Sequence, residues 1–191
     1  MEFLFLTGCR PCEVYPITWN DIKWDKRVIV FSKSYESRSK ALSKGRTKNG
    51  TIRTFPFYPR LEQLLLRLRD ERFKGDNNAL VFSKSDGRQF SRNDIAFSWQ
   101  GYSKANGKRF MDYPGIVTQL AKEGKITQYL KPYSTRHTFI SLQVLGALNN
   151  PNDKTNFVGQ IKYIADLVGN SVETIQKHYL DKPRNAELLD I

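Results

Sequence analysis

The segments Arg27-Val-Ile-Val-Phe-Ser-Lys-Ser-Tyr35 and Gly50-Thr-Ile-Arg-Thr-Phe-Pro-Phe57 carry the strongest strand signals in this sequence. The first is rich in β-branched and aromatic residues, and the second alternates in the manner of a strand with one buried face. We predict that the two segments pair as a β-hairpin, joined by the polar and basic stretch 36–49. The sequence therefore places a small antiparallel element in the first third of the chain.

Helical patterns flank this hairpin on both sides. Residues 2–7 read as the last turns of a helix that ends at Gly8, and residues 10–18 as a second short helix. Beyond the hairpin, apolar residues recur at i, i+3, i+4 and i+7 and predict an amphipathic helix over 60–73. Further helices are predicted over 91–104, 113–122, 134–148, 157–168 and 171–180.

Caps and apolar spacing set the limits of these later helices. Ser91 followed by Asp94 resembles a capping box, and Ser171 fits an N-cap. Gly169 is expected to end the helix over 157–168. Within the helix over 134–148, we expect an inward face made of three apolar residues, Phe139, Leu142 and Leu145.

Length, charge and cysteine content limit the class of protein. The chain has 191 residues, which favours one domain, and a formal net charge of +12. The N-terminal apolar run is far shorter than the roughly 20 residues of a membrane span, and no basic region precedes it. Two cysteines exclude a disulfide-rich scaffold. We expect a soluble, cytoplasmic domain whose excess charge favours nucleic acid first and anionic membrane second.

The basic residues are concentrated around the connection of the predicted hairpin. A solvated surface is the ordinary explanation of such a run, whereas contact with phosphates would fit a strongly basic chain. We predict phosphate contact. The seven basic residues, against the single acid Glu36, are Lys33, Arg38, Lys40, Lys44, Arg46, Lys48 and Arg53.

Common catalytic and metal-binding patterns have little support. Cys9-Arg-Pro-Cys12 is a lone C-x-x-C motif, and neither histidine, His137 nor His178, lies near it in sequence, so structural cysteines are expected. The sequence has no G-x-S-x-G turn, no Gly-rich phosphate loop and no acidic cluster typical of a two-metal nuclease. Phosphodiester chemistry without a metal needs a nucleophile, cations and an acid. The chain offers Arg10, Lys48, Arg136 and Tyr179.

These residues lie in four motifs that resemble those of the tyrosine recombinase (phage integrase) family. Thr7-Gly-Cys-Arg10-Pro-Cys-Glu13 is similar to T-G-x-R-x-x-E, and Lys48-Asn-Gly-Thr-Ile-Arg53-Thr-Phe-Pro56 is similar to K-x-x-x-x-R-x-x-P. Pro132-Tyr-Ser-Thr-Arg136-His-Thr138 is similar to the H-x-x-R-H-T box. Leu167-Val-Gly-Asn170, followed nine residues later by Tyr179, resembles the L-G-H segment and its tyrosine. The motifs occur in the family's order from Thr7 to Tyr179.

The resemblance implies an α+β fold, mostly α-helical with a small antiparallel β-sheet, like a tyrosine recombinase catalytic domain. It implies DNA cleavage and rejoining through a 3′-phosphotyrosyl intermediate on Tyr179, with no metal or other cofactor. Arg10 and Arg136 would stabilise the phosphorane, and Lys48 would protonate the leaving 5′ oxygen. Each residue alone also has an ordinary explanation, such as packing of Tyr179, and Lys44 or Arg46 are alternatives to Lys48.

Two positions depart from the family pattern. Tyr133 replaces the histidine of H-x-x-R, and Asn170 replaces the histidine or tryptophan that follows the glycine. Both keep a hydrogen-bonding group but not imidazole chemistry. His137 is not expected to substitute, because neighbouring helical residues point in different directions.

The resemblance also implies partners and leaves alternatives open. Double-stranded DNA is the expected partner, with a monomer in free solution, a tetramer on synapsed DNA, and nucleoid association if the source is prokaryotic. The family's upstream DNA-clamping domain is expected to lie outside this chain. The alternatives are a catalytically impaired DNA-binding protein on the same scaffold, a type IB topoisomerase-like enzyme, and a basic module for RNA or anionic membrane.

Overall fold

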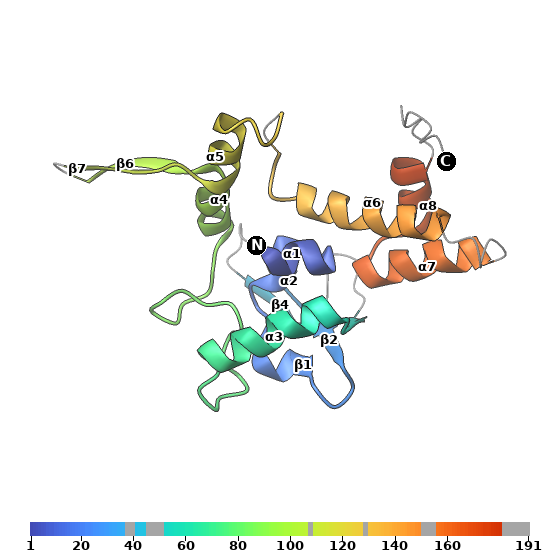
Figure 1. Ribbon diagram of the computed structural model, residues 1–191. Coiled ribbons are helices and arrows are strands. Elements are labelled where there is room, and N and C mark those ends of the chain that lie inside the picture. The colour runs from blue at the N-terminus through green and yellow to red at the C-terminus, as the bar shows by residue number, and fades with distance from the viewer. Residues whose placement is uncertain (37–40, 45–51, 107–108, 128–129, 150–155, 181–191) are drawn as a thin grey trace.

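The structure, a computed structural model, describes residues 1–36, 41–44, 52–106, 109–127, 130–149 and 156–180. Its main sheet is antiparallel with the order β1-β2-β5, formed by β1 (Ile22–Lys23), β2 (Val28–Phe31) and β5 (Arg53–Pro56). Ile29 of β2 lies opposite Phe55 of β5, and both side chains are buried. The predicted pairing of the two strand-like segments is thus confirmed, and the small antiparallel sheet lies among helices (Figure 1).

Two further hairpins were not predicted from the sequence. β3 (Lys33–Glu36) pairs with β4 (Ala41–Lys44), so the basic connection contains a second two-stranded sheet. β6 (Tyr102–Asn106) pairs with β7 (Arg109–Tyr113), and this hairpin extends away from the helices in Figure 1. The helix predicted over 91–104 ends earlier because Gly101, at φ 91°, turns the chain into β6. The helix predicted from residue 113 begins at Ile116 for the same reason, since the chain up to Tyr113 is in β7.

The other helices follow the sequence patterns, with two exceptions: the helix predicted over 10–18 ends at Val14, and the helix predicted over 171–180 is α-helical only up to Ile175. Ser91 caps its helix by accepting a bond from the Asp94 amide, as the capping box predicted. The helices are α1 (Glu2–Thr7), α2 (Pro11–Val14), α3 (Pro59–Arg72), α4 (Arg92–Gln100), α5 (Ile116–Lys122), α6 (Ser134–Leu148), α7 (Phe157–Val168) and α8 (Val172–Ile175). A short 3-10 helix, η1 (Trp19–Asp21), precedes β1, and a π-helical segment, η3 (Gln176–Leu180), follows α8.

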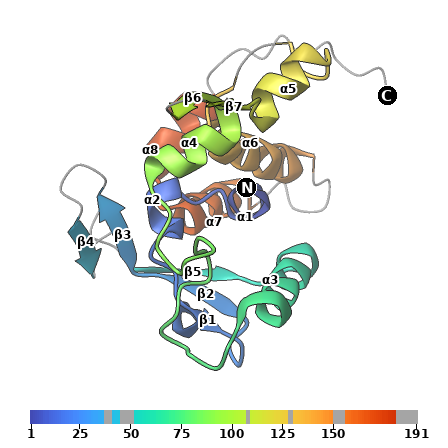
Figure 2. The same ribbon diagram turned by 90° about the vertical axis from the view of Figure 1, so that its left-hand side faces the viewer.

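The elements are arranged in layers around α1 and α2. In Figures 1 and 2 these two helices lie between the main sheet with α3 on one side and the group α6, α7 and α8 on the other. α1 packs against α3 and α6, and α7 packs against α6 and β5. No helix in the described ranges is long and apolar enough to cross a bilayer.

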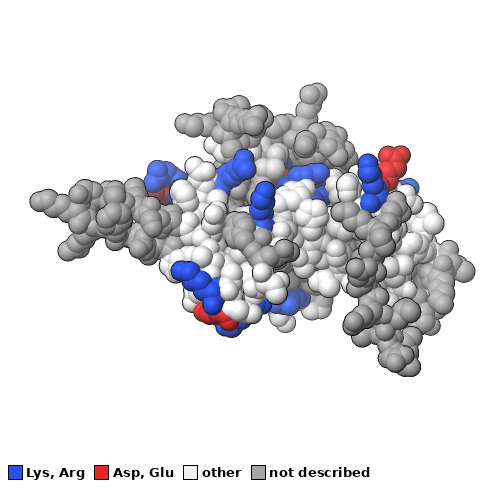
Figure 3. Space-filling model, turned by 90° about the horizontal axis from the view of Figure 1, so that it is seen from above, with Lys and Arg blue, Asp and Glu red and all other residues white. Residues whose placement is uncertain are grey.

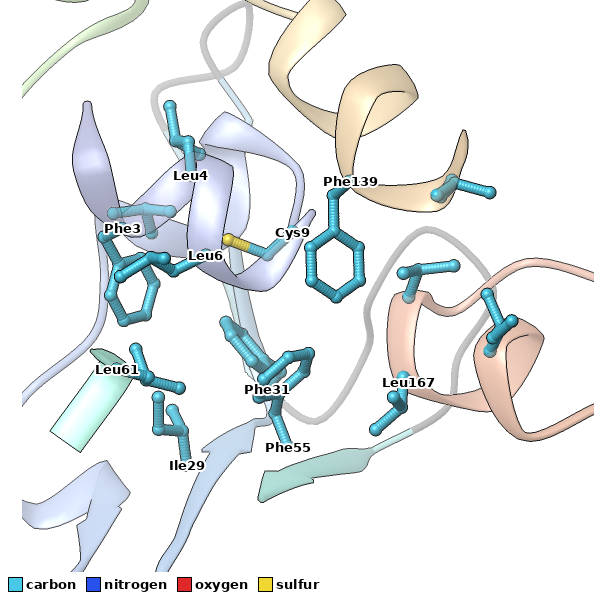
Figure 4. Packing of buried hydrophobic residues seen from close by; sticks show 14 of the residues in the cluster. Phe3, Leu4, Leu6, Cys9, Ile29, Phe31, Phe55, Leu61, Phe139 and Leu167 are labelled. Carbon is cyan, nitrogen blue, oxygen red and sulfur yellow. The ribbon is translucent and has the colours of Figure 1, made fainter. Parts of the chain in front are cut away.

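The core joins α6 to the sheet through Phe139. Its ring lies 6.0 Å from that of Phe55, next to Cys9 and Phe31 (Figure 4). The prediction that Leu142 and Leu145 also face inward is wrong, because these side chains are 61% and 38% exposed. Three residues turn a helix by about 300°, so a row with a spacing of three winds away from the core. The buried face of α6 consists instead of Thr135, Arg136, Phe139, Ile140 and Val144.

Candidate active site

Arg10 and Arg136, the two arginines of the recombinase-like motifs, each bind the C-terminus of a helix. Gly8 ends α1 in a left-handed conformation, and its carbonyl oxygen accepts a hydrogen bond of 2.8 Å from Arg136. Gly169 ends α7 in the same manner, and its carbonyl oxygen accepts one of 3.1 Å from Arg10. Carbonyl groups at a helix C-terminus lack intrahelical donors and carry partial negative charge. Each guanidinium is therefore positioned by the end of a helix that is distant in sequence.

Arg136 is almost completely buried, with 1% of its surface exposed. Its second terminal nitrogen donates to Asn170 Oδ1 at 2.8 Å, so Asn170 fixes the plane of the guanidinium. Burial, and next the positive charge of Arg10, lower the pKa of Arg136. The structure thus brings Arg10, Arg136 and Asn170 together from three separate segments.

Glu13 is the buried carboxylate of this cluster. It accepts bonds from the backbone amide and the guanidinium of Arg10, at 2.9 and 3.2 Å, and two from Arg53, at 3.0 and 2.7 Å. Arg53 also donates to the carbonyl oxygen of Leu167 and lies over the ring of Phe31. Burial favours the neutral acid, but the bonds and charge of Arg53 and Arg10 outweigh it and lower the pKa of Glu13. Glu13 is therefore ionised and ties the two arginines together.

The cluster keeps an excess of positive charge. The positive charges of Arg10 and Arg53 both act on the guanidinium of Arg136. Glu13 forms ion pairs with Arg10 and Arg53. Guanidinium groups bind phosphate oxygens through two parallel donors. Arg10 also lines a surface cleft. The arrangement is suited to an anion such as a phosphate group.

Tyr179 lies on η3, next to the start of α6. Its hydroxyl lies 2.7 Å from Nδ1 of His137, and 8% of the residue is exposed. Burial raises the pKa of Tyr179, and the positive charge of Arg136 acts in the opposite direction. Tyr133, the N-cap of α6, is 43% exposed, and its ring centroid is 5.3 Å from that of His137. The predicted nucleophile thus lies at the same helix end as Arg136.

The sequence predicts no role for His137, but the structure places its imidazole against the hydroxyl of Tyr179. Arg136 points into the core while His137 is exposed, so the two do diverge as expected. However, η3 packs against α6 and brings Tyr179 to the side that His137 faces. The sequence held no signal for this contact, because it depends on how η3 is placed on α6.

The residues predicted to bind DNA are distributed differently from the expectation. Arg53 is 9% exposed and bound to Glu13, so it is part of the interior rather than of a basic surface. Lys33 forms an ion pair with Asp21 and also donates to Thr18. Only the backbone is described for Lys44, and the others lie outside the described residues: Arg38, Lys40, Arg46 and the proposed acid Lys48.

A cleft of about 630 Å³ opens beside Arg10, between α2, α4 and the segment that leads into α6. Its lining includes the basic side chains of Arg92 and Lys131 and the aromatic rings of Tyr15 and Tyr133. Sequence reasoning missed Arg92 and Lys131, which lie in no motif. From above, Lys and Arg are more frequent than Asp and Glu among the described residues (Figure 3).

The two cysteines are both free. Burial raises the pKa of Cys9 to about 12, despite a hydrogen bond from Thr7 that lowers it, so the thiol is protonated and inert. Cys12 lines the cleft beside Arg10. The described residues contain no group of three or more His, Cys, Asp or Glu side chains that could hold a metal ion.

Comparison with solved structures finds the same fold in a transposon integrase. Two structures of the Tn1549 transposon integrase, both of residues 82–397 in complex with circular intermediate DNA, match at 18% identity with TM-scores of 0.62 and 0.63. A third, in complex with transposon right end DNA, matches at 17% identity with a TM-score of 0.62. The matches cover 92–95% of this chain and 51–54% of the integrase chains. The chain therefore spans about half the length of these structures.

Comparison of the sequences identifies the family. No curated protein sequence matches the chain. The sequence profile of the phage integrase family matches residues 1–142, which include Arg10 and Arg136. This chain belongs to the phage integrase family.

Proposed function

We propose that this chain cleaves and rejoins DNA strands in site-specific recombination, with Tyr179 as the nucleophile. The observation that carries the proposal is the convergence of Arg10, Arg136, Asn170 and Tyr179 on one positively charged cluster from four segments of the chain. Nothing in local secondary structure requires these residues to meet. Their meeting supports a shared anionic ligand, and the scissile phosphate is the one that the family relationship indicates.

In the proposed reaction, the guanidinium groups bind the phosphate before the tyrosine attacks it. Arg10 lines the cleft and would donate to one non-bridging oxygen, while Arg136 stabilises the charge from inside the protein. The oxygen of Tyr179 forms a bond to phosphorus, and the bond from phosphorus to the 5′ oxygen breaks. The leaving oxygen takes a proton from Lys48, and the 3′-phosphotyrosyl bond conserves the energy needed for rejoining.

Asn170 and Tyr133 have different parts in this proposal. The Asn170 side chain uses its oxygen to accept from Arg136, so its amide group is oriented as a donor for a phosphate oxygen. Tyr133 lines the cleft together with Arg10 and offers its hydroxyl to the bound phosphate there. Both positions therefore support phosphate binding, and neither supplies an imidazole.

The DNA would lie across the cleft beside Arg10. Arg92 and Lys131 line this cleft, and β3 packs against α2, so the hairpin that leads toward Lys48 begins next to the cluster. Basic side chains along one groove neutralise successive phosphates and make binding dependent on salt.

We propose that free protein is monomeric and that recombination takes place in a tetramer on two duplexes. We also propose that the protein acts in the cytoplasm, on the nucleoid if its source is prokaryotic.

The test is a covalent trap with a nicked duplex that releases the 5′ fragment after cleavage. We expect a protein–DNA adduct whose DNA-linked peptide contains Tyr179. Tyr179→Phe keeps the ring and removes the nucleophile, so binding should persist and the adduct should disappear. Tyr163→Phe, a change at an exposed tyrosine of α7, is the matched control and should form the adduct normally.

Two outcomes separate the alternatives. Tight DNA binding by the unmodified chain without any adduct would identify a DNA-binding protein that has lost catalysis. The grounds for this alternative are Tyr133 and Asn170, which stand where the family pattern has other residues. An adduct that maps to a different tyrosine would contradict the assignment of Tyr179.

A second experiment tests the proposed proton donor of the leaving group. Lys48→Ala should slow cleavage, and a substrate with sulfur at the 5′ bridging position should restore the cleavage rate.

A further inference from the structure

The hydroxyl of Tyr179 has a specific partner in the structure. Nδ1 of His137 lies 2.7 Å from the phenolic oxygen, and the two ring centroids are 5.8 Å apart. Tyr133 precedes His137 by four residues on α6, and its ring packs edge-on against the same imidazole. The contact joins residues 42 positions apart in sequence, so it is a product of tertiary packing rather than of a local turn.

Geometry and chemistry together assign a role to this contact. We propose that His137 is the general base that accepts the phenolic proton when Tyr179 attacks DNA, an inference that rests on the proposed function. Neutral His137, protonated at Nε2, presents the Nδ1 lone pair to the Tyr179 hydroxyl. The proton moves to Nδ1 as the oxygen–phosphorus bond forms, and the bond to the 5′ oxygen breaks with protonation of that oxygen by Lys48. On rejoining, His137 returns the proton to Tyr179.

The surroundings of Tyr179 explain why a base is needed. Burial raises the pKa of Tyr179, and the positive charge of Arg136 opposes that effect without reversing it. The hydroxyl therefore keeps its proton at neutral pH. A base within hydrogen-bond distance is typically worth about 10²- to 10⁴-fold in rate. A neutral imidazole is an effective base near neutral pH, so the side chain of His137 is suited to accept this proton.

The neighbours of His137 define what a pH profile would report. Among the described residues, the titratable groups in contact with His137 include the phenols of Tyr133, at the N-cap of α6, and Tyr179, on η3. The charged group nearest in the same helix is the buried guanidinium of Arg136. The sequence contains one other histidine, His178, which is exposed and follows Lys177 on η3. Histidine substitutions can therefore be compared as a pair.

The experiment measures the single-turnover rate of adduct formation on the nicked duplex from pH 5.5 to 9. For the unmodified chain, we expect the rate to rise with pH and to level off once the imidazole is neutral. His137→Ala should be about 10²- to 10⁴-fold slower at pH 7 and should keep rising with pH beyond neutrality, as the unassisted phenol ionises. His178→Ala should keep the unmodified rate and profile.

His137→Asn separates a base from a positioning residue. Its amide oxygen can still accept a hydrogen bond from Tyr179, but it cannot take up the proton at neutral pH. We expect His137→Asn to be as slow as His137→Ala, with DNA binding measured by anisotropy unchanged. A fast His137→Asn beside a slow His137→Ala would show that His137 only positions Tyr179 and would overturn the inference.

The remaining outcomes distinguish this inference from the proposed function. If all histidine variants react like the unmodified chain, which itself forms the adduct, His137 is not the base and the proposed function stands. If the unmodified chain forms no adduct, the proposed function fails and this inference fails with it. Circular dichroism shows whether each variant is folded. If His137→Ala is unfolded, the rate of His137→Asn alone shows whether His137 acts as the base.

Discussion

Replacement of Glu13 by glutamine tests the network that holds the two arginines. The carboxylate accepts four hydrogen bonds of 2.7–3.2 Å from Arg10 and Arg53, and its side chain is 1% exposed. Glutamine has one acceptor oxygen and no charge, so Glu13→Gln leaves two largely buried cations without their counter-ion. Removal of one partner of a buried ion pair costs about 3–5 kcal/mol. That is a large fraction of the roughly 5–15 kcal/mol by which a domain is stable.

The assay is equilibrium unfolding in urea. With a slope of about 2 kcal/mol per M, the midpoint of Glu13→Gln should fall by about 1.5–2.5 M. The matched control is Glu62→Gln. Glu62 also binds an arginine through two bonds, to Arg27 at 2.6 and 2.7 Å, but this pair lies at the surface, where water screens it. The midpoint of Glu62→Gln should stay close to that of the unmodified chain.

The pH dependence of the same measurement gives a second check. Because the folded-state pKa of Glu13 is lowered, its contribution to stability is present above the unfolded-state value of 4.5 and is lost as pH falls through the folded-state pKa. The gap between the unmodified chain and Glu13→Gln should therefore narrow on acidification below about pH 4.5. A loss of stability below about 1 kcal/mol for Glu13→Gln at neutral pH, or equal losses at Glu13 and Glu62, would show that Glu13 is not the essential counter-ion of the buried arginines.

Packing and charge at three other positions can be tested in the same way. Gly8→Ala would place a Cβ 2.5 Å from the ring of Phe139 at a φ of 58°, so it should destabilise the protein and slow adduct formation. The control is Gly75→Ala, at a φ of 88° with open space around it, which should show only the cost of a positive φ. Phe139→Ala should cost about 3–5 kcal/mol in urea unfolding, while Leu142→Ala, at a 61% exposed position, should cost much less; equal losses would contradict the assigned inward face of α6. If Arg92 binds a phosphate, Arg92→Ala should lower the slope of log affinity against log salt by about 0.9. An unchanged slope would show that Arg92 does not contact DNA.

Local chemistry in the sequence predicted the helix limits well. The Ser91 cap, the Gly8 and Gly169 termini, and the bounds of α6 and α7 are confirmed because caps and left-handed glycines act within one turn of the chain. The failures occurred where local preference was weak. The β6–β7 hairpin has no strong alternation, and the helices predicted over 91–104 and 113–122 overlap only its two ends, at residues 102–104 and at Tyr113.

Which cations belong to the site could not be read from composition. Arg53 and Lys33 looked like members of a basic surface run, but Arg53 pairs with Glu13 across 40 residues and Lys33 pairs with Asp21. Arg92 and Lys131 lay in no motif, yet they line the cleft beside Arg10. The net charge of a sequence gives the number of charged residues but does not show which of them are neutralised by partners.

The family, the order of the motifs and the residue at each motif position can be read from the amino-acid sequence, because they depend on residue identity and spacing alone. Which of those residues meet depends on the packing of the helices and the sheet. The carbonyl groups of Gly8 and Gly169 reach Arg136 and Arg10 because α1 and α7 end beside them. Tyr179 meets His137 because η3 packs against α6. Contacts between segments far apart in sequence arise when helices bury their apolar faces together, and no local pattern records that arrangement.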